Sequence, residues 1–220
     1  MDWFPLFNSL RVSALSAAIV FFPGVAAAYY IARLPRASRR ALDVLFTLPL
    51  VLPPTVVGYL LLCVFGPRRV VGAWALERFA VELTGQWWSA VPAVSLIIFP
   101  LMYRMARGAF ERFDETLSDA GRTLGLSGAW IFWHVRMPAC RQGILAGAAL
   151  SFARALGEYG ATSMLAGHVP GSTATIATGV YELWRVGDDA LALRWVLVSI
   201  ALSAAALLAV NLLEKREGRR

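Results

Sequence analysis

Hydrophobic stretches of membrane-spanning length alternate with short, arginine-rich segments along the chain. A helix that crosses a bilayer needs about 20 consecutive, mostly apolar residues, and five stretches approach or exceed that length. Four of them have centres without any charged residue, whereas the remaining one carries Arg154 and Glu158. We therefore predict five spans, over about residues 11–32, 44–66, 87–107, 143–166 and 194–213.

A polar insert, residues 110–138, separates the third and fourth spans. Apolar residues recur in it at helical spacing, as one stripe of Phe110, Phe113, Leu117, Ala120 and Leu124. Gly125 fits the position just past a helix end, and Ser127 can cap a second short helix over residues 128–134. Pro138 is expected to break the chain before the fourth span. The pattern predicts a helix–turn–helix on the membrane surface.

The second and fourth spans contain residues that disturb a helix. Pro49, Pro53 and Pro54 predict that the second span is bent or broken, either to line a pathway or only for packing. In the fourth span, Arg154 and Glu158 are four residues apart and can pair. They mark either a translocation pathway or gate, or an ion pair that fixes helix register.

Glycines add a second disturbance to the fourth span. Gly157, Gly160, Gly167 and Gly171 predict a broken helix that turns back near the outer face. Earlier in the same span, Gly143 and Gly147 form a pair of small residues that allows a neighbouring helix to approach closely.

Composition places the chain in the membrane class. Hydrophobic residues make up 58% of the 220, and the mean hydropathy is +0.60, both well above the soluble globular range. Because lipid cannot hydrogen-bond the backbone, the spans must be helices. We predict an all-α membrane protein with one transmembrane domain over residues 1–220. Residues 1–10 carry no basic residue, so we expect no cleaved signal peptide.

The charge distribution predicts the orientation. The net charge is +7, and all but one of the 21 basic residues are arginine. Basic residues concentrate after the first span, between the third and fourth spans, and in the C-terminal tail. The positive-inside rule places these segments in the cytoplasm and the N-terminus outside. The polar insert then lies in the cytoplasm, where its acidic residues disfavour anionic headgroups, and a groove in a partner protein fits it better.

Motifs for chemistry on a substrate are missing. The only lysine is Lys215, so a phosphate loop of the GxxxxGK[ST] type cannot occur. The sequence has no HExxH or GxSxG motif and no Cys/His cluster at metal-ligand spacing. We expect a non-catalytic protein without cofactor or metal. An intramembrane enzyme using Arg154, Glu158 and His168, or a passive channel, are the alternatives from other classes.

The polar insert resembles a family motif. Its order is Asp119-Ala120-Gly121, three residues, Gly125, nine residues, then Val135-x-Met137-Pro138. This is similar to the EAA motif of ABC importer permeases, Glu-Ala-Ala-x3-Gly-x9-Ile-x-Leu-Pro, with the same spacing throughout. Gly in place of the second Ala is expected to soften the helix. Residues 48–60, 152–162 and 169–176 look like the molybdate importer permease, and sulfate and tungstate permeases share part of this pattern.

The resemblance covers about residues 10–213 and implies a type I ABC importer permease of five spans in the bacterial inner membrane. It implies a homodimer, two cytoplasmic ATPase subunits and a periplasmic oxyanion-binding protein as partners. The residues implied in ATPase coupling are Asp119, Ala120, Gly121, Gly125, Val135, Met137 and Pro138. From the disturbed spans, the candidates for a pathway or gate are Pro53, Pro54, Arg154, Glu158 and Gly160.

Overall fold

The computed structural model describes residues 2–215, and this part of the chain is helical without a strand. The helices in chain order are α1 Phe4–Ile31, α2 Arg36–Val51, α3 Pro54–Phe65, α4 Val70–Phe79, η1 Trp87–Ser89, α5 Ala90–Glu111, α6 Glu115–Thr123, α7 Gly128–Ile131, the π-helical turn η2 Phe132–Arg136, α8 Met137–Leu156, α9 Gly160–Leu165, α10 Ile176–Val186 and α11 Asp189–Lys215.

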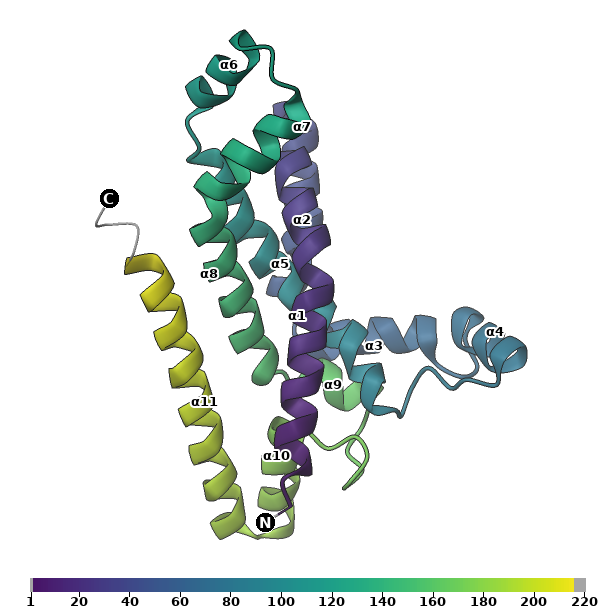
Figure 1. Cartoon of the computed structure of the whole chain (residues 1–220). Coiled ribbons are helices and arrows are strands. Elements are labelled where there is room, and N and C mark those ends of the chain that lie inside the picture. The colour runs from purple at the N-terminus through teal and green to yellow at the C-terminus, as the bar shows by residue number, and fades with distance from the viewer. Residues whose placement is uncertain (1, 216–220) are drawn as a thin grey trace.

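Three helices, α1, α5 and α8, run side by side and form the core (Figure 1). Glycines bring them together, because a Cβ at Gly24 would lie 2.8 Å from Met102 Cγ and one at Gly147 would lie 2.7 Å from Met105 Cβ. A Cβ at Gly143 would lie 2.9 Å from Ala109 Cβ. The close approach predicted for Gly143 and Gly147 is confirmed, and α5 is the neighbour.

Within residues 2–215, three helical segments are long and apolar enough to cross a membrane: Phe4–Ile31, Trp87–Glu111 and Asp189–Leu208. The pair α2 and α3 passes the same test if it is counted as one span. The helix α8 has 20 residues and is long enough, but it is not apolar enough to be counted with them. The molecule is therefore a helical membrane protein, and the count of five spans stays a prediction.

The predicted break in the second span is confirmed. The helix α2 ends at Val51, and α3 leaves it at an angle of 105°. Pro54 occupies the first turn of α3, where its missing N–H costs nothing. Pro49 lies inside α2 without ending it. The predicted break in the fourth span is confirmed as well, since α8 ends at Leu156 and α9 begins at Gly160.

Two predictions for the polar insert are wrong. The stripe from Phe110 to Leu124 is not one helix, because Phe110 belongs to α5 and is buried in the core. The chain turns at residues 112–114, and Asp114 starts α6 as its N-cap, which is the position that Asp favours.

Pro138 does not break the chain. Helical backbone continues from Gly128 to Leu156, and Pro138 lies in the first turn of α8 directly after the π turn η2. A proline ring clashes with the carbonyl four residues earlier in a regular helix, and a widened π turn is one way to accommodate such a local defect.

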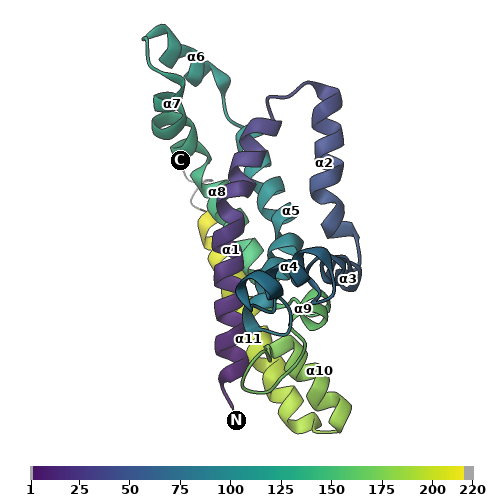
Figure 2. The same ribbon diagram turned by 90° about the vertical axis from the view of Figure 1, so that its right-hand side faces the viewer.

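The helix ends lie at two opposite ends of the molecule, and the basic segments of the sequence fall at one of them. In Figures 1 and 2, the end of α1, the start of α2 and the pair α6–α7 lie at one end of the molecule. The start of α1, α10 and the start of α11 lie at the other end. The basic segments at residues 33–40 and 104–141 therefore share one end.

Polar side chains near the start of α1 bind the segment before α10, at the end of the molecule opposite α6. Asn8, 1% exposed, donates from Nδ2 to the carbonyls of Thr173 and Ala174 at 3.0 and 3.1 Å. The Ser9 hydroxyl accepts from the N–H of Ile176 at 2.9 Å. These bonds hold the α9–α10 connection against α1.

Candidate functional site

The helix α6 is a separately capped element at the basic end of the molecule. At its start, Asp114 accepts a hydrogen bond from the Thr116 N–H at 3.0 Å. Hydrogen bonds from Thr116 lower the pKa of the Asp114 carboxyl. The hydrogen bonds from Thr116 favour the ionised form of the Asp114 carboxylate. The helix dipole also favours negative charge at a helix N-terminus.

The end of α6 has a glycine stop. Gly125 has a φ of +76°, and its N–H donates to the carbonyl of Arg122 at 2.9 Å. The N–H of Leu126 donates to the carbonyl of Gly121 at 3.1 Å. These two bonds form a Schellman motif. The position predicted for Gly125 is confirmed.

Gly121 brings α6 against α7. A Cβ there would lie 3.0 Å from Cγ1 and 3.1 Å from Cδ1 of Ile131, so a larger residue would force the Ile131 side chain to shift. The cap predicted for Ser127 is confirmed, since its hydroxyl accepts from the Trp130 N–H at 3.2 Å. The glycine in the motif therefore serves a tight contact, which the sequence did not indicate.

Arg136 is a residue of this site that was not predicted from the sequence. It is only 5% exposed, and it donates to the Glu115 carboxylate and, at 3.1 Å, to the Ser118 hydroxyl. Its guanidinium also lies over the rings of Phe113 and Tyr29, at 4.7 and 5.7 Å. Arg136 thus joins α6 to the start of α8 and the end of α1. Its role becomes visible only from its burial in the folded chain, because its partner Glu115 is 21 residues away and no local sequence pattern links the two.

The other motif residues lie around this joint. Asp119 and Ala120 are exposed on α6, and Asp119 pairs with Arg122 at 3.0 Å. Leu117 and Leu124 on the same element are 50% and 78% exposed. The second half of the motif runs from η2 into α8, with Val135 and Met137 half-buried and Pro138 exposed. The structure brings the two halves together through Gly121 and Arg136.

A second cluster joins α2 to α5 near the same end. The Asp43 carboxylate accepts hydrogen bonds from the Tyr103 hydroxyl and the Arg107 guanidinium. Arg107 Nε also donates to Glu111 at 2.8 Å. These residues have no local signal in the sequence, because the partners are about 60 positions apart.

The two broken spans meet. A Cβ at Gly160 would lie 3.0 Å from Pro54 Cβ and 3.0 Å from the Thr55 nitrogen. One at Gly58 would lie 2.9 Å from Ala161 Cα. The helices α3 and α9 therefore cross at backbone contact, and they bring the pathway candidates Pro53, Pro54 and Gly160 into one region.

Arg154 and Glu158 pair as predicted, at 2.9 Å. The other carboxylate oxygen of Glu158, Oε1, accepts from the Ala161 N–H at 3.0 Å. The Glu158 side chain is 1% exposed, whereas that of Arg154 is 35% exposed. Glu158 therefore has the contacts of a residue that fixes the α8–α9 break, and Arg154 is the more exposed member of the pair.

His168, the third residue of the alternative enzyme hypothesis, has a partner outside the Arg154–Glu158 pair. His168 Nδ1 lies 3.0 Å from the Thr178 hydroxyl, and burial lowers the pKa of the imidazole. In the described part of the chain, no hydrogen bond joins His168 to Arg154 or Glu158. Residues 2–215 also hold no group of three or more His, Cys, Asp or Glu suited to a metal ion.

Known proteins match this chain over most of its length. The family model described as "Binding-protein-dependent transport system inner membrane component" matches residues 24–219. The molybdenum transport system permease protein ModB of Escherichia coli (strain K12) is 39% identical over 209 residues, which cover 94% of this chain and 91% of ModB. The sulfate transport system permease protein CysT of the same strain is 30% identical over 214 residues, covering 96% of this chain and 77% of CysT.

The fold is that of type I ABC importer permeases. A chain of the methionine ABC transporter MetNI in an inward-facing conformation superposes with a TM-score of 0.75. The identity is 12%, and the match covers 98% of this chain and 99% of that chain.

Proposed function

The chain belongs to the family of binding-protein-dependent transport system inner membrane components, and on this premise we propose that it is the permease subunit of an ATP-driven molybdate importer. The relative ModB, at 39% identity, supports molybdate as the cargo. The sulfate permease CysT is more distant, at 30% identity. Sulfate and tungstate are the competing cargoes of the same class.

The observation that carries the proposal is the construction of α6. It is capped at both ends, seated on α7 through Gly121 and joined to α8 through Arg136. It exposes Leu117, Ala120 and Leu124 for a partner. We propose that this surface binds a cytoplasmic ATPase subunit, because the chain has no phosphate loop of its own.

Two copies of the chain form the transporter in this proposal. Five helices are too few to enclose a path for a tetrahedral oxyanion, so a second copy related by a two-fold axis completes it. Two ATPase subunits dock on the two α6 helices, and a periplasmic binding protein delivers the anion at the opposite end. The N-terminus lies in the periplasm and the C-terminus in the cytoplasm.

The arrangement of the helices provides a route by which closing of the ATPase pair moves the membrane spans. ATP binding closes the ATPase pair and draws the two α6 helices together. Continuous helix from Gly128 to Leu156 carries this motion to the α8–α9 break, where Glu158 holds the start of α9. Since α9 crosses α3 at Gly58 and Gly160, both broken spans move together, and the pathway alternates between inward-open and outward-open states.

Uptake into reconstituted vesicles tests the function. We expect radioactive molybdate to accumulate only with ATP, the ATPase subunit and the binding protein all present. Uptake without ATP would indicate a passive channel instead. Excess sulfate that abolishes molybdate uptake as effectively as unlabelled molybdate would contradict the cargo assignment.

The variant Glu158→Gln separates permease from enzyme. It keeps an acceptor for the Ala161 N–H and removes the charge. Retained uptake in this variant would exclude an essential chemical role for Glu158. Chemical conversion of a substrate by the wild-type chain without an ATPase partner would support the enzyme instead.

A further inference from the structure

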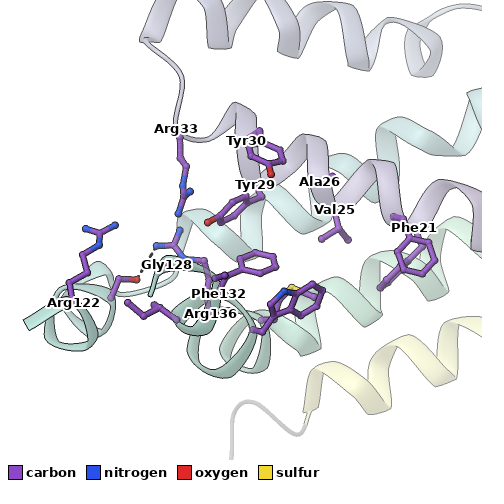
Figure 3. Close-up of a pocket in the computed structure, with 16 residues that line it drawn as sticks. Phe21, Val25, Ala26, Tyr29, Tyr30, Arg33, Arg122, Gly128, Phe132 and Arg136 are labelled. Carbon is purple, nitrogen blue, oxygen red and sulfur yellow. Dashed lines mark hydrogen bonds between the residues drawn. The ribbon is translucent and has the colours of Figure 1, made fainter. Parts of the chain in front are cut away.

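A groove of about 670 Å³ lies between the end of α1 and the α6–α7–η2 segment (Figure 3). One wall is the face of α1 that carries Phe21, Val25 and Tyr29. The opposite wall includes Phe132 and Trp133 of η2. The lining is mainly aromatic and aliphatic, so an occupant must present apolar surface to most of the groove.

Arginines close one end of the groove. Figure 3 shows Arg33, Arg122 and Arg136 gathered there, with Phe21 at the far end. No aspartate or glutamate is among the residues that line the groove, so the acidic residues of the polar insert, which disfavour anionic headgroups, are not part of its wall. An occupant that matches this lining has an apolar body and an anionic head.

Two of these arginines can bind an anion. Arg136 is already paired with Glu115. Arg122 pairs with Asp119, but both side chains are more than 60% exposed, and such surface pairs are weak. Arg33 lies over the Tyr29 ring at 3.8 Å, and no carboxylate within the described residues pairs with it.

The length of the groove fits one leaflet of a bilayer. From Phe21 to Tyr29, eight residues of helix rise about 12 Å, and half of the hydrocarbon core is about 15 Å thick. Tyr29 and Tyr30 lie at the end of this stretch, and tyrosine favours the headgroup level. The arginines come next along the groove, and with Phe21 to Tyr29 inside the leaflet they would be at the level of the lipid phosphates.

We propose that this groove binds one anionic phospholipid of the cytoplasmic leaflet, with its acyl chains along Phe21 and Val25 and its phosphate between Arg33 and Arg122. A neutral lipid does not match the arginines, and a free oxyanion does not match the apolar wall. The site is separate from the exposed face of α6 that we propose for the ATPase.

Native mass spectrometry of the full-length chain, purified and stripped of lipid, tests the proposal directly. Phosphatidylglycerol is added in one arm, phosphatidylcholine in a second and inorganic phosphate in a third. We expect one phosphatidylglycerol to stay bound and to raise the Tm, with no such effect in the other arms. Equal binding of phosphatidylcholine, or the same rise in Tm with phosphate alone, would overturn the proposal.

Two pairs of variants locate the lipid. Arg33→Gln should weaken phosphatidylglycerol binding about fivefold, as expected for one arginine near a charged surface. Arg40→Gln removes the same charge from the first turns of α2, outside the groove, and should leave binding unchanged. Ala26→Trp fills the groove and should weaken phosphatidylglycerol binding. Ala14→Trp adds the same bulk on α1 away from the groove and should not. If the two arginine variants, or the two tryptophan variants, weaken lipid binding equally, the proposed site is contradicted.

The assembled transporter provides the last arm, and it needs no variant. Phosphatidylglycerol should remain bound when the ATPase subunit and the second copy are present. Loss of the lipid on assembly would show that the groove is a protein interface and would overturn the proposal.

Discussion

Gly125 and Gly128 lie three residues apart, and a Cβ would meet no atom within 4 Å at either position. Only Gly125 has a positive φ. An L side chain in that left-handed region costs roughly 1 kcal/mol or more. The sequence predicts this difference correctly, because the helical pattern ends at Gly125 and the conformation follows from local chemistry.

The first prediction compares the two glycines. Gly125→Ala should lower the free energy of opening α6 by about 1 kcal/mol, whereas Gly128→Ala should leave it unchanged or raise it slightly. Hydrogen exchange of the α6 amides in detergent measures both. Equal exchange rates in the two variants would mean that the Schellman stop does not limit the stability of α6.

The pair of Arg136 and Glu115 is asymmetric, since Arg136 is 6% and Glu115 is 60% exposed at the side chain. Glu115→Ala leaves a buried charge without a carboxylate, which should destabilise the chain by up to about 3 kcal/mol. Arg136→Met leaves a carboxylate that water can solvate, so its cost should be smaller. Thermal unfolding of both variants gives the order. A larger loss with Arg136→Met would show that packing on Tyr29 and Phe113 outweighs the ion pair.

Acidification should loosen the start of α6. The pKa of Asp114 is lowered in the folded state, so its contribution to stability is present above its ordinary pKa of 3.8. That contribution is lost as the pH falls through the lower, folded value. The Thr116 amide should therefore exchange relatively faster below about pH 4, after correction for intrinsic rates. Asp114→Ala should remove this dependence, and a dependence that persists would assign it to another group.

At the scale of elements, the sequence predicts where helices are disturbed but not what they contact. Prolines at 53 and 54 and the glycines after residue 156 are local signals, and both breaks are found. That the breaks meet through Gly58 and Gly160 depends on residues about 100 positions apart. For the same reason Arg136 was missed, and Phe110 was assigned to the wrong helix although its spacing is helical.

The crossing of α3 and α9 gives a prediction of its own. Gly58→Ala would place a Cβ 2.9 Å from the backbone of Ala161, and such overpacking costs about 1–3 kcal/mol. Gly179→Ala in α10 meets open space and should be neutral or stabilising, because alanine favours helix. Thermal unfolding compares the two. Equal stability of both variants would show that the crossing adjusts freely.

For the whole molecule, the arginine distribution predicts a direction in the membrane, and the helix ends sort in the same way. Ser38 and Ser172 are exposed at the two ends. In a chain whose native Cys63 and Cys140 are replaced, Ser172→Cys should react with a membrane-impermeant thiol reagent in intact spheroplasts. Ser38→Cys should react only after permeabilisation. The reverse pattern would invert the proposed topology.

The coupling role of α6 is the central claim for the whole transporter. The measurement that tests it most directly is the number of molybdate ions imported per ATP hydrolysed in vesicles, for Gly125→Val and Gly128→Val side by side. Because a β-branched residue is a strong outlier at positive φ, Gly125→Val should lose uptake, either with hydrolysis continuing or with the ATPase subunit no longer bound. Gly128→Val should retain the wild-type ratio. Wild-type uptake and ratio in Gly125→Val, with the ATPase bound, would contradict the account.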